Sequence, residues 1–304
     1  MKLKTKNLLT LSELSQNEFS KLIDFSIKLK NELKKGGNKP LLKNKTLTMI
    51  FQKPSTRTRV SFEVGMFQLG GKAITLSSND MQLSRGESIE DTARTLSRYT
   101  DCIMARVYDH NLLENLSKYS SVPVINGLSD SFHPCQILAD VMTIKEKKRK
   151  LQGLKIAWIG DGNNVCNSMI NGCALSKMNM WIATPKGFEP NQVVVKEARK
   201  LTNIEITTDP IKAVKDADVV VTDTFTSIHN RDVKRTKKFL PKYQVNSKLM
   251  KYAKKNAIFM HCLPAKRGSE VTSSVIDGSQ SVIWDEAENR LHTQKALLAF
   301  LIRA

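Results

Sequence analysis

The chain has 304 residues, of which 40% are hydrophobic and 25% are charged. This length and composition suit two domains with separate cores, and they exclude a disordered, collagenous or coiled-coil protein. Forty-eight Lys and Arg against 29 Asp and Glu give a formal charge of +19, which favours anionic partners, either nucleic acids or small anions.

Cysteine usage and hydropathy indicate the compartment. The five cysteines are odd in number and form no C-x-x-C motif, so neither a disulfide framework nor a zinc site is indicated. No apolar run approaches the roughly 20 residues of a bilayer span, and residues 1–10 lack the apolar stretch of a signal peptide. We therefore expect a cytoplasmic protein that does not bind membranes.

Short apolar runs alternate with helix-like patterns along the chain, which is typical of parallel β-α-β units. The runs predicted as strands are 47–51, 73–76, 102–107, 122–125, 156–159, 181–184, 204–207, 219–223 and 258–261. This alternation predicts an α/β fold with two doubly wound domains, each built on a parallel sheet.

A charged run, 145–150, closes the helix predicted after His133 and marks the break between the halves. We place the first domain at 1–150 and the second at 151–304. The last segment has an apolar helical face, and we expect this C-terminal helix to pack back on the first domain. The residues of that face are Ala296, Leu297, Phe300 and Leu301.

The segment after the first predicted strand is the most informative. Residues 55–59 read Ser-Thr-Arg-Thr-Arg, and the helix that follows has apolar residues at Val60, Val64 and Phe67. Hydroxyls, a guanidinium and backbone N–H groups would converge at the positive end of a helix dipole, which favours a phosphate. The plainer interpretation makes Ser55 an N-cap and the arginines surface charges. The segment is no G-x-x-x-x-G-K-[ST] loop, so a nucleoside triphosphate with magnesium is not indicated.

Three further groups follow predicted strands, where α/β folds bind ligands. Arg106 lies near the end of the strand at 102–107, His133-Pro134-Cys135-Gln136 opens a helix, and His261-Cys262-Leu263-Pro264 ends the last strong strand. Each alone is ordinarily structural, whereas their joint occurrence indicates a site.

A turn at 159–165 is similar to a dinucleotide-binding motif, but Val165 replaces the third glycine. The following strand, 181–184, also lacks the acidic residue that would hold a ribose hydroxyl. A dehydrogenase is therefore not indicated, although the turn could still present Asn164 to a ligand.

Four motifs occur in one order, and together they resemble the ornithine carbamoyltransferases from about Leu8 to the C-terminus. They are S-T-R-T-R at 55–59, H-P-x-Q at 133–136, D-G-N-N at 161–164 and H-C-L-P at 261–264. The resemblance implies a carbamoyl-phosphate domain, an ornithine domain, and carbamoyl transfer to the δ-amine of L-ornithine, giving L-citrulline and phosphate. It implies no metal and no organic cofactor. Family members are trimers or assemblies of trimers with shared active sites.

The resemblance also assigns residues to carbamoyl phosphate. The catalytic group is Arg57, Arg106, His133 and Cys262. The substrate-binding group is Ser55, Thr56, Arg57, Thr58, Gln82, Arg106, His133, Gln136, Cys262, Leu263 and Arg290, with Gln82 donated by a neighbouring subunit. Within it, Thr58, Arg106 and His133 would face the carbonyl oxygen, whereas Gln136 and the Leu263 carbonyl would orient the carbamoyl nitrogen.

For ornithine, the resemblance implies Asn164, Asp223, Ser227 and Ile228, with the δ-nitrogen near Cys262. The family pattern usually continues after the serine with Met-Gly, whereas this chain has Ile228-His229. Glycine there would ease a hinge in a loop that covers ornithine. Ile228 is then expected to supply the apolar cover.

Alternatives remain at this point. Putrescine or an N-acylated ornithine could be the acceptor, although Asp223, Ser227 and Asn164 favour a free α-amino acid. The charge of +19 could instead mark a nucleic-acid-binding protein, but the lysines are spread along the chain and aromatic residues make up only 6%. We therefore expect no nucleic-acid partner. The sequence leaves open whether the reaction serves arginine biosynthesis or breakdown.

Overall fold

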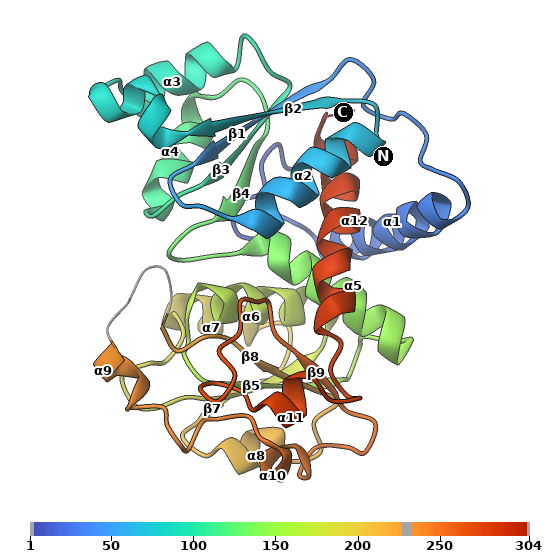
Figure 1. The fold of residues 1–304 in the computed structure, drawn as a ribbon, viewed down its shortest axis with the longest axis vertical. Helices are drawn as coiled ribbons and strands as arrows, with labels where there is room; N and C mark the ends of the chain where they lie inside the picture. Colours follow the sequence, from blue (N-terminus) through green and yellow to red (C-terminus); the bar gives the residue numbers. More distant parts are fainter. Residues whose placement is uncertain (1–2, 227–232, 303–304) are drawn as a thin grey trace. The chain divides into compact units, whose positions relative to one another are not determined.

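The computed structural model describes residues 3–226 and 233–302. They divide into two compact units (Figure 1): unit 1 comprises Met1–Met142 and Glu288–Ala304, and unit 2 comprises Thr143–Ala287. The division falls inside two helices, α5 (Pro134–Lys148) and α12 (Ile283–Ile302). None of the described helices has the length and apolar character needed to cross a bilayer.

Unit 1 is built on a parallel sheet of order β2-β1-β3-β4. Its strands are β1 (Thr46–Phe51), β2 (Lys72–Ser77), β3 (Cys102–Arg106) and β4 (Val124–Leu128). The helices are α1 (Gln16–Lys34), α2 (Thr56–Gln68), α3 (Ile89–Leu96) and α4 (His110–Tyr119), with short 3₁₀ turns η1 (Ser78–Asp80) and η2 (Gln82–Arg85). Strands β3 and β4 are buried throughout, as expected for a parallel sheet covered on both faces.

Unit 2 repeats this design with the strand order β7-β6-β5-β8-β9, again parallel. Its strands are β5 (Lys155–Ile159), β6 (Asn179–Ala183), β7 (Ile204–Thr207), β8 (Val219–Thr222) and β9 (Ile258–Met260). Its helices are α6 (Asn164–Ser176), α7 (Gln192–Ala198), α8 (Pro210–Val214), α9 (Val233–Thr236), α10 (Ser247–Met250) and α11 (Ser273–Ile276). The predicted fold of two doubly wound parallel sheets is confirmed.

Each sheet has one topological switch point, which is a pair of adjacent strands from which the chain continues in opposite directions. In unit 1 the chain leaves β1 toward β2 and later crosses to β3 on the other side of β1. In unit 2 the corresponding pair is β5 and β8. Loops after such a pair of strands diverge and leave room for a ligand at their carboxyl ends. The candidate site is therefore expected after β1 and β3 in one unit, and after β5 and β8 in the other.

The C-terminal helix α12 packs on unit 1, as predicted. Its Phe300 ring stacks on Phe25 of α1 with 5.1 Å between centroids. The buried Lys295 ammonium donates hydrogen bonds of 2.7 Å to the side-chain oxygens of Asn38 and Gln68. An apolar stack and a satisfied buried cation thus hold α12 against α1 and α2.

A buried tryptophan supports the turn after β5. Trp158 has no exposed surface, and its indole Nε1 donates to the Asp161 carbonyl at 2.9 Å. Gly162 lies in the same turn, and a Cβ there would lie 2.3 Å from the Pro190 nitrogen. Gly162 therefore serves close packing in this turn, which accounts for its presence without a dinucleotide.

We expect Trp158→Phe to lower the free energy of unfolding by about 1–2 kcal/mol, because it removes one buried hydrogen bond and part of a packed ring. Urea titration measures this change. Trp284, which is 69% exposed, provides the control, and Trp284→Phe should stay within about 0.5 kcal/mol of the parent chain. Equal effects of the two substitutions would contradict this account of the turn.

Candidate active site

The loop after β1 leads into the start of α2 in unit 1, a position whose chemistry suits an anion. Ser55 is the N-cap of α2, and its side-chain oxygen accepts from the Thr58 N–H at 3.3 Å. The first N–H groups of a helix lack intrahelical acceptors and carry its positive dipole end. Arg57 lies half-buried in this first turn. The N-cap interpretation of Ser55 is thus correct, and it is compatible with a phosphate site.

Arg106 ends β3 next to this loop. Its Cα pairs with that of Phe51 at the end of β1, and its carbonyl accepts from the Gln52 N–H at 2.9 Å. The side chain is only 6% exposed. The pairing with β4 shifts register between Ala105 and Arg106, an irregularity that commonly re-aims a side chain at a functional site. The switch point of unit 1 therefore carries a buried guanidinium.

Arg290 joins three helices of unit 1. From α12, its Nη1 donates to Gln136 Oε1 on α5 at 2.6 Å, and its Nη2 donates to Thr58 Oγ1 on α2 at 3.2 Å. Gln136 in turn donates from Nε2 to Asp140 Oδ1 at 2.8 Å. All of these side chains are buried. Residues widely separated in the chain are thereby fixed by one hydrogen-bonded network.

His133 lies among the arginines and is uncharged. The ring is 5% exposed, and burial together with the charges of Arg290, Arg106 and Arg57 holds its pKa well below the usual range. A neutral imidazole can donate one N–H without adding charge. The structure thus gathers Arg57, Arg106, His133, Gln136 and Arg290 around one place. It is suited to hold a dianion and to stabilise negative charge on a carbonyl oxygen.

Gln82 is the exception among the unit 1 residues predicted for the site. It begins η2 and is exposed. A residue donated to a neighbouring subunit would be exposed in a single chain, so this placement is compatible with the prediction.

In unit 2, Asp223 follows β8 and Asn163 follows β5, on either side of the switch point. Asn163 caps α6 by accepting from the N–H groups of Val165 and Cys166, each at 3.0 Å. Its Nδ2 donates to Asp223 Oδ2 at 2.7 Å. Asn164, the residue that sequence reasoning chose, is buried at the start of α6. Sequence reasoning missed Asn163, although an asparagine directly before a helix is a recognisable N-cap.

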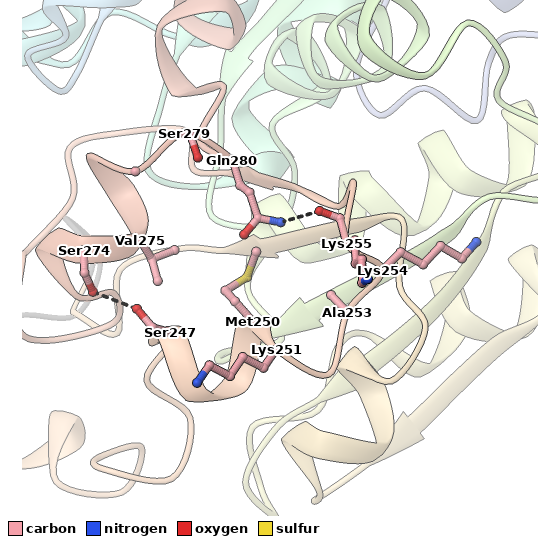
Figure 2. A pocket seen from close by; sticks show the side chains of 11 residues that line it. Ser247, Met250, Lys251, Ala253, Lys254, Lys255, Ser274, Val275, Ser279 and Gln280 are labelled. Atoms are coloured by element: carbon pink, nitrogen blue, oxygen red, sulfur yellow. Dashed lines mark hydrogen bonds between the residues drawn. The ribbon is translucent and has the colours of Figure 1, made fainter.

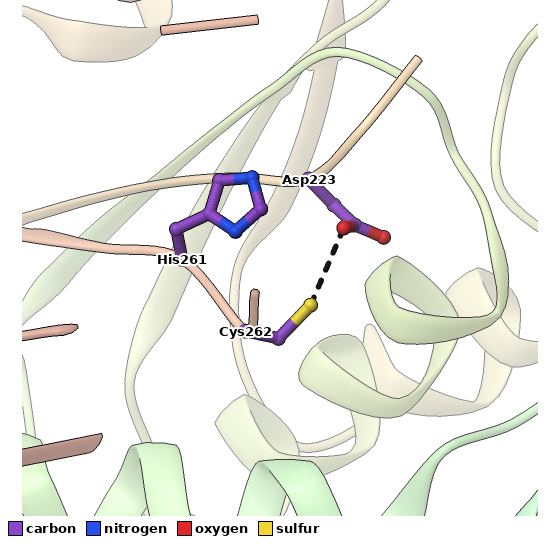
Figure 3. A group of neighbouring side chains, drawn as sticks. All are labelled: Asp223, His261 and Cys262. Atoms are coloured by element: carbon purple, nitrogen blue, oxygen red, sulfur yellow. Dashed lines mark hydrogen bonds between the residues drawn. The ribbon is translucent and has the colours of Figure 1, made fainter. Parts of the chain in front are cut away.

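Cys262 follows β9, and its thiol donates to Asp223 Oδ1 at 3.3 Å (Figure 3). The carboxylate thus accepts from a thiol on one oxygen and from an amide on the other. Each contact helps to fix its orientation. Ser227 and Ile228, the other residues predicted to bind ornithine, lie outside the described residues together with His229.

His261 and Glu270 hold the Cys262–Leu263 segment in place. The fully buried His261 accepts the Leu263 N–H on Nδ1 at 2.9 Å, and its Nε2 lies 3.3 Å from Glu270 Oε1. Leu263 has a φ of +58°, which is costly for a branched side chain and requires such support. Burial acts to raise the pKa of Glu270, but hydrogen bonds from His261 and the Lys266 N–H keep it below the usual value. Sequence reasoning did not single out Glu270.

The side chains of Asp223, His261 and Cys262 form a group of a type that can bind metal. Their ligand atoms lie within 4.8 Å of one another (Figure 3). The thiol, however, is hydrogen-bonded to the carboxylate, and both imidazole nitrogens have partners. This arrangement is that of a polar pocket with positioned side chains, and it needs no ion to explain it.

A separate cavity of about 500 Å³ lies in unit 2 (Figure 2). Its lining includes Ala253–Lys255, which precede β9, so it adjoins the amino end of the strand whose carboxyl end leads to Cys262. It contains none of the predicted site residues. We therefore assign the chemistry to the carboxyl ends of the strands and not to this cavity.

Comparison with known proteins identifies relatives over the whole chain. Models of the carbamoyl-phosphate-binding and Asp/Orn-binding domains of aspartate/ornithine carbamoyltransferase match residues 6–146 and 152–301. The ornithine carbamoyltransferase of Cenarchaeum symbiosum is 60% identical over 303 residues, covering 99% of both chains. That of Methanocaldococcus jannaschii is 50% identical over 302 residues, covering 97% of this chain and 98% of the relative. The structure of the Pyrococcus furiosus ornithine carbamoyltransferase has a TM-score of 0.94 at 51% identity, covering 98% of this chain and 97% of that one.

The surroundings of His133 predict that its ring stays uncharged from mildly acidic to alkaline pH, because burial and three guanidinium groups oppose protonation. Side-chain NMR of ¹⁵N-histidine-labelled protein measures this, with His133→Gln identifying the resonance by its loss. A titration midpoint near the ordinary histidine value of about 6.5 would contradict the prediction.

Proposed function

The chain belongs to the aspartate/ornithine carbamoyltransferase family, and from this premise we infer its reaction. It transfers the carbamoyl group of carbamoyl phosphate to the δ-amine of L-ornithine, giving L-citrulline and phosphate. The observation that carries this conclusion is the gathering of Arg57, Arg106 and Arg290 around the uncharged His133. Such a site suits a dianionic phosphate joined to a planar carbonyl.

The first domain, residues 1–150, binds carbamoyl phosphate in this proposal. Ser55, Thr56, Arg57 and Thr58 hold the phosphate together with Arg106. The start of α2 and the fork geometry of arginine both support this assignment. Thr58, Arg106 and His133 donate to the carbonyl oxygen, where negative charge grows in the tetrahedral intermediate.

Arg290 has a positioning role as well as a binding role. Its hydrogen bonds to Gln136 and Thr58 set the direction in which these two side chains point. Gln136 and the Leu263 carbonyl then orient the carbamoyl nitrogen. Arg290 itself lies near the carbonyl end of the substrate.

The second domain, residues 151–304, binds ornithine. Asn164, Asp223, Ser227 and Ile228 hold the amino acid, and Asp223 supplies a carboxylate for the α-ammonium group. The bond between Asp223 and Asn163 supports this role because it fixes one carboxylate oxygen. Cys262 forms part of the polar pocket for the δ-nitrogen and is not a covalent nucleophile.

The reaction requires an uncharged δ-amine, whereas a free alkylamine with a pKa near 10 is almost entirely protonated at neutral pH. The nitrogen lone pair attacks the carbonyl carbon, and a C–N bond forms. The bond from that carbon to the phosphate oxygen then breaks, and the amine loses a proton. Arg57 stabilises the departing phosphate.

The rate of carbamoyl transfer should depend on the acceptor amine. Carbamoyl phosphate with L-ornithine should give rapid citrulline formation, whereas putrescine and N-acetylornithine in parallel assays should react at least about a hundredfold more slowly. The reason is that each leaves buried polar groups of the acceptor site unpaired. Preference for putrescine would contradict the ornithine assignment.

Arg57→Ala serves as the negative variant in the same assay, with an expected loss of about a hundred- to a thousandfold in rate and an unchanged thermal transition. Arg94→Ala is the matched control, because Arg94 pairs with Glu90 on the exposed face of α3. Near-normal turnover by Arg57→Ala would refute the phosphate assignment.

We also propose a cytoplasmic homotrimer that acts in arginine biosynthesis, with Gln82 of one subunit completing the site of the next. The five free cysteines support a reducing compartment. The outer face of α2 supports association: Val60 and Phe67, one heptad apart, are 50% and 80% exposed. Ile74 on the neighbouring edge strand β2 is also 50% exposed.

Shared sites predict complementation between inactive variants. Arg57→Ala and Gln82→Ala should each be impaired alone, yet mixed and reassembled chains should regain roughly a quarter of full activity, since that fraction of sites receives both intact residues. Light scattering should report three 34.2-kDa chains per particle. A monomer, or no recovery on mixing, would contradict the proposal.

A further inference from the structure

A lysine that the proposed reaction does not use lies beside the phosphate-binding loop. Lys53 precedes Ser55 by two residues, and it is only 1% exposed. Its Nζ lies 3.9 Å from the centroid of the Tyr108 ring. The Tyr108 N–H donates to Gln52 Oε1 at 2.9 Å, so the loops after β1 and β3 are joined next to the lysine.

Charges of both signs act on the Lys53 ammonium. Arg106 repels this ammonium and Asp130 attracts it, and the ring of the titratable Tyr108 lies against it. The attraction of a cation to a tyrosine ring is weaker than the cost of burying an ammonium. Burial first, and then Arg106, therefore lower the pKa of Lys53 to about 8.

This balance depends on what the neighbouring site holds. Without an anion, Lys53 and Arg106 are like charges in a poorly hydrated place, and losing the Lys53 proton relieves their repulsion. A bound dianion would reverse the preference, because it attracts both cations. Substrate binding and protonation of Lys53 are then linked and must strengthen each other.

We propose that Lys53 is a positioning residue of the carbamoyl-phosphate site. Its ammonium, held beneath Tyr108, balances the dianion together with Arg106. The protein therefore takes up a proton at Lys53 when carbamoyl phosphate binds in mildly alkaline solution. The inference rests on the proposed function. The proton comes from the buffer and passes to the neutral ε-amine, with no other chemical change.

The size of the effect follows from the titration of one group. With a pKa of about 8 in the free protein, roughly a quarter of Lys53 is protonated at about pH 8.5, so binding should take up about three-quarters of a proton. At about pH 7 the uptake should fall to roughly a tenth of a proton. Carbamoyl phosphate is already a dianion there, since phosphate monoesters have a second pKa near 6, and it contributes little to the uptake.

Calorimetric titration of the full chain with carbamoyl phosphate, without ornithine, measures this uptake in two buffers of different ionisation enthalpy. In Lys53→Arg, whose guanidinium keeps its proton, the uptake at about pH 8.5 should vanish while binding persists and no longer weakens with rising pH. In Lys53→Met the uptake should also vanish, and affinity should fall about tenfold or more at neutral pH.

Lys295 offers a matched control. It is fully buried, and burial lowers its pKa to about 8 as well, but its partners are Asn38 and Gln68. Lys295→Met should keep the proton uptake of the parent chain. An unchanged thermal transition shows that each variant is folded.

Two results would overturn the inference: a parent chain that binds carbamoyl phosphate at about pH 8.5 without proton uptake, or a Lys53→Arg variant that retains the uptake. Either result can occur while citrulline formation is normal, and it then refutes only the role of Lys53. Absence of both binding and citrulline would instead refute the proposed function.

Discussion

Positive charge gathered in a poorly hydrated place is the constraint on which the site in unit 1 depends. Arg106 and Arg290 are buried, Arg57 is half-buried, and all three act on His133. Such a cluster is unfavourable by itself, because each ion loses water and repels its neighbours. The fold tolerates it through the Gln136–Asp140 network and through a His133 that remains neutral. The same features suit the cluster to a dianion, because a bound dianion would offset the repulsion among the guanidinium groups.

In unit 2, the contacts around Asp223 keep one carboxylate in a fixed orientation. Asp223 receives a hydrogen bond on each oxygen, from Asn163 and from Cys262. The Cys262 segment is in turn held by His261, which Glu270 orients. Asn163, His261 and Glu270 thus help to determine where Asp223 and Cys262 point, as supporting residues commonly do around functional sites.

Local signals explain why the fold could be predicted and parts of the site could not. The fully buried strands β3 and β8 are apolar runs in the sequence, and their carboxyl ends are marked by Arg106, the last residue of β3, and by Asp223, which follows β8. The start of one strand differs from the predicted start because of a proline. Pro123 has no N–H to donate to a neighbouring strand, and β4 begins at Val124 instead of the predicted residue 122. Glu270 acts through His261 and the Lys266 N–H, and Lys53 lies against Tyr108, and neither set of contacts has a local sequence signal. In a chain with 48 Lys and Arg, nothing local distinguishes the buried Lys53 from solvated lysines.

The position of Arg290 in the chain has a consequence for biogenesis. This arginine completes a network whose other members, Thr58 and Gln136, lie before unit 2, while Arg290 itself follows it. A ribosome must therefore translate all of residues 143–287 before the guanidinium becomes available to the earlier half. The N-terminal segment emerges first and can begin to collapse on its own, but it remains unfinished while attached to a stalled or truncated nascent chain. Incomplete translation products would thus lack the hydrogen bonds of Arg290 to Thr58 and Gln136.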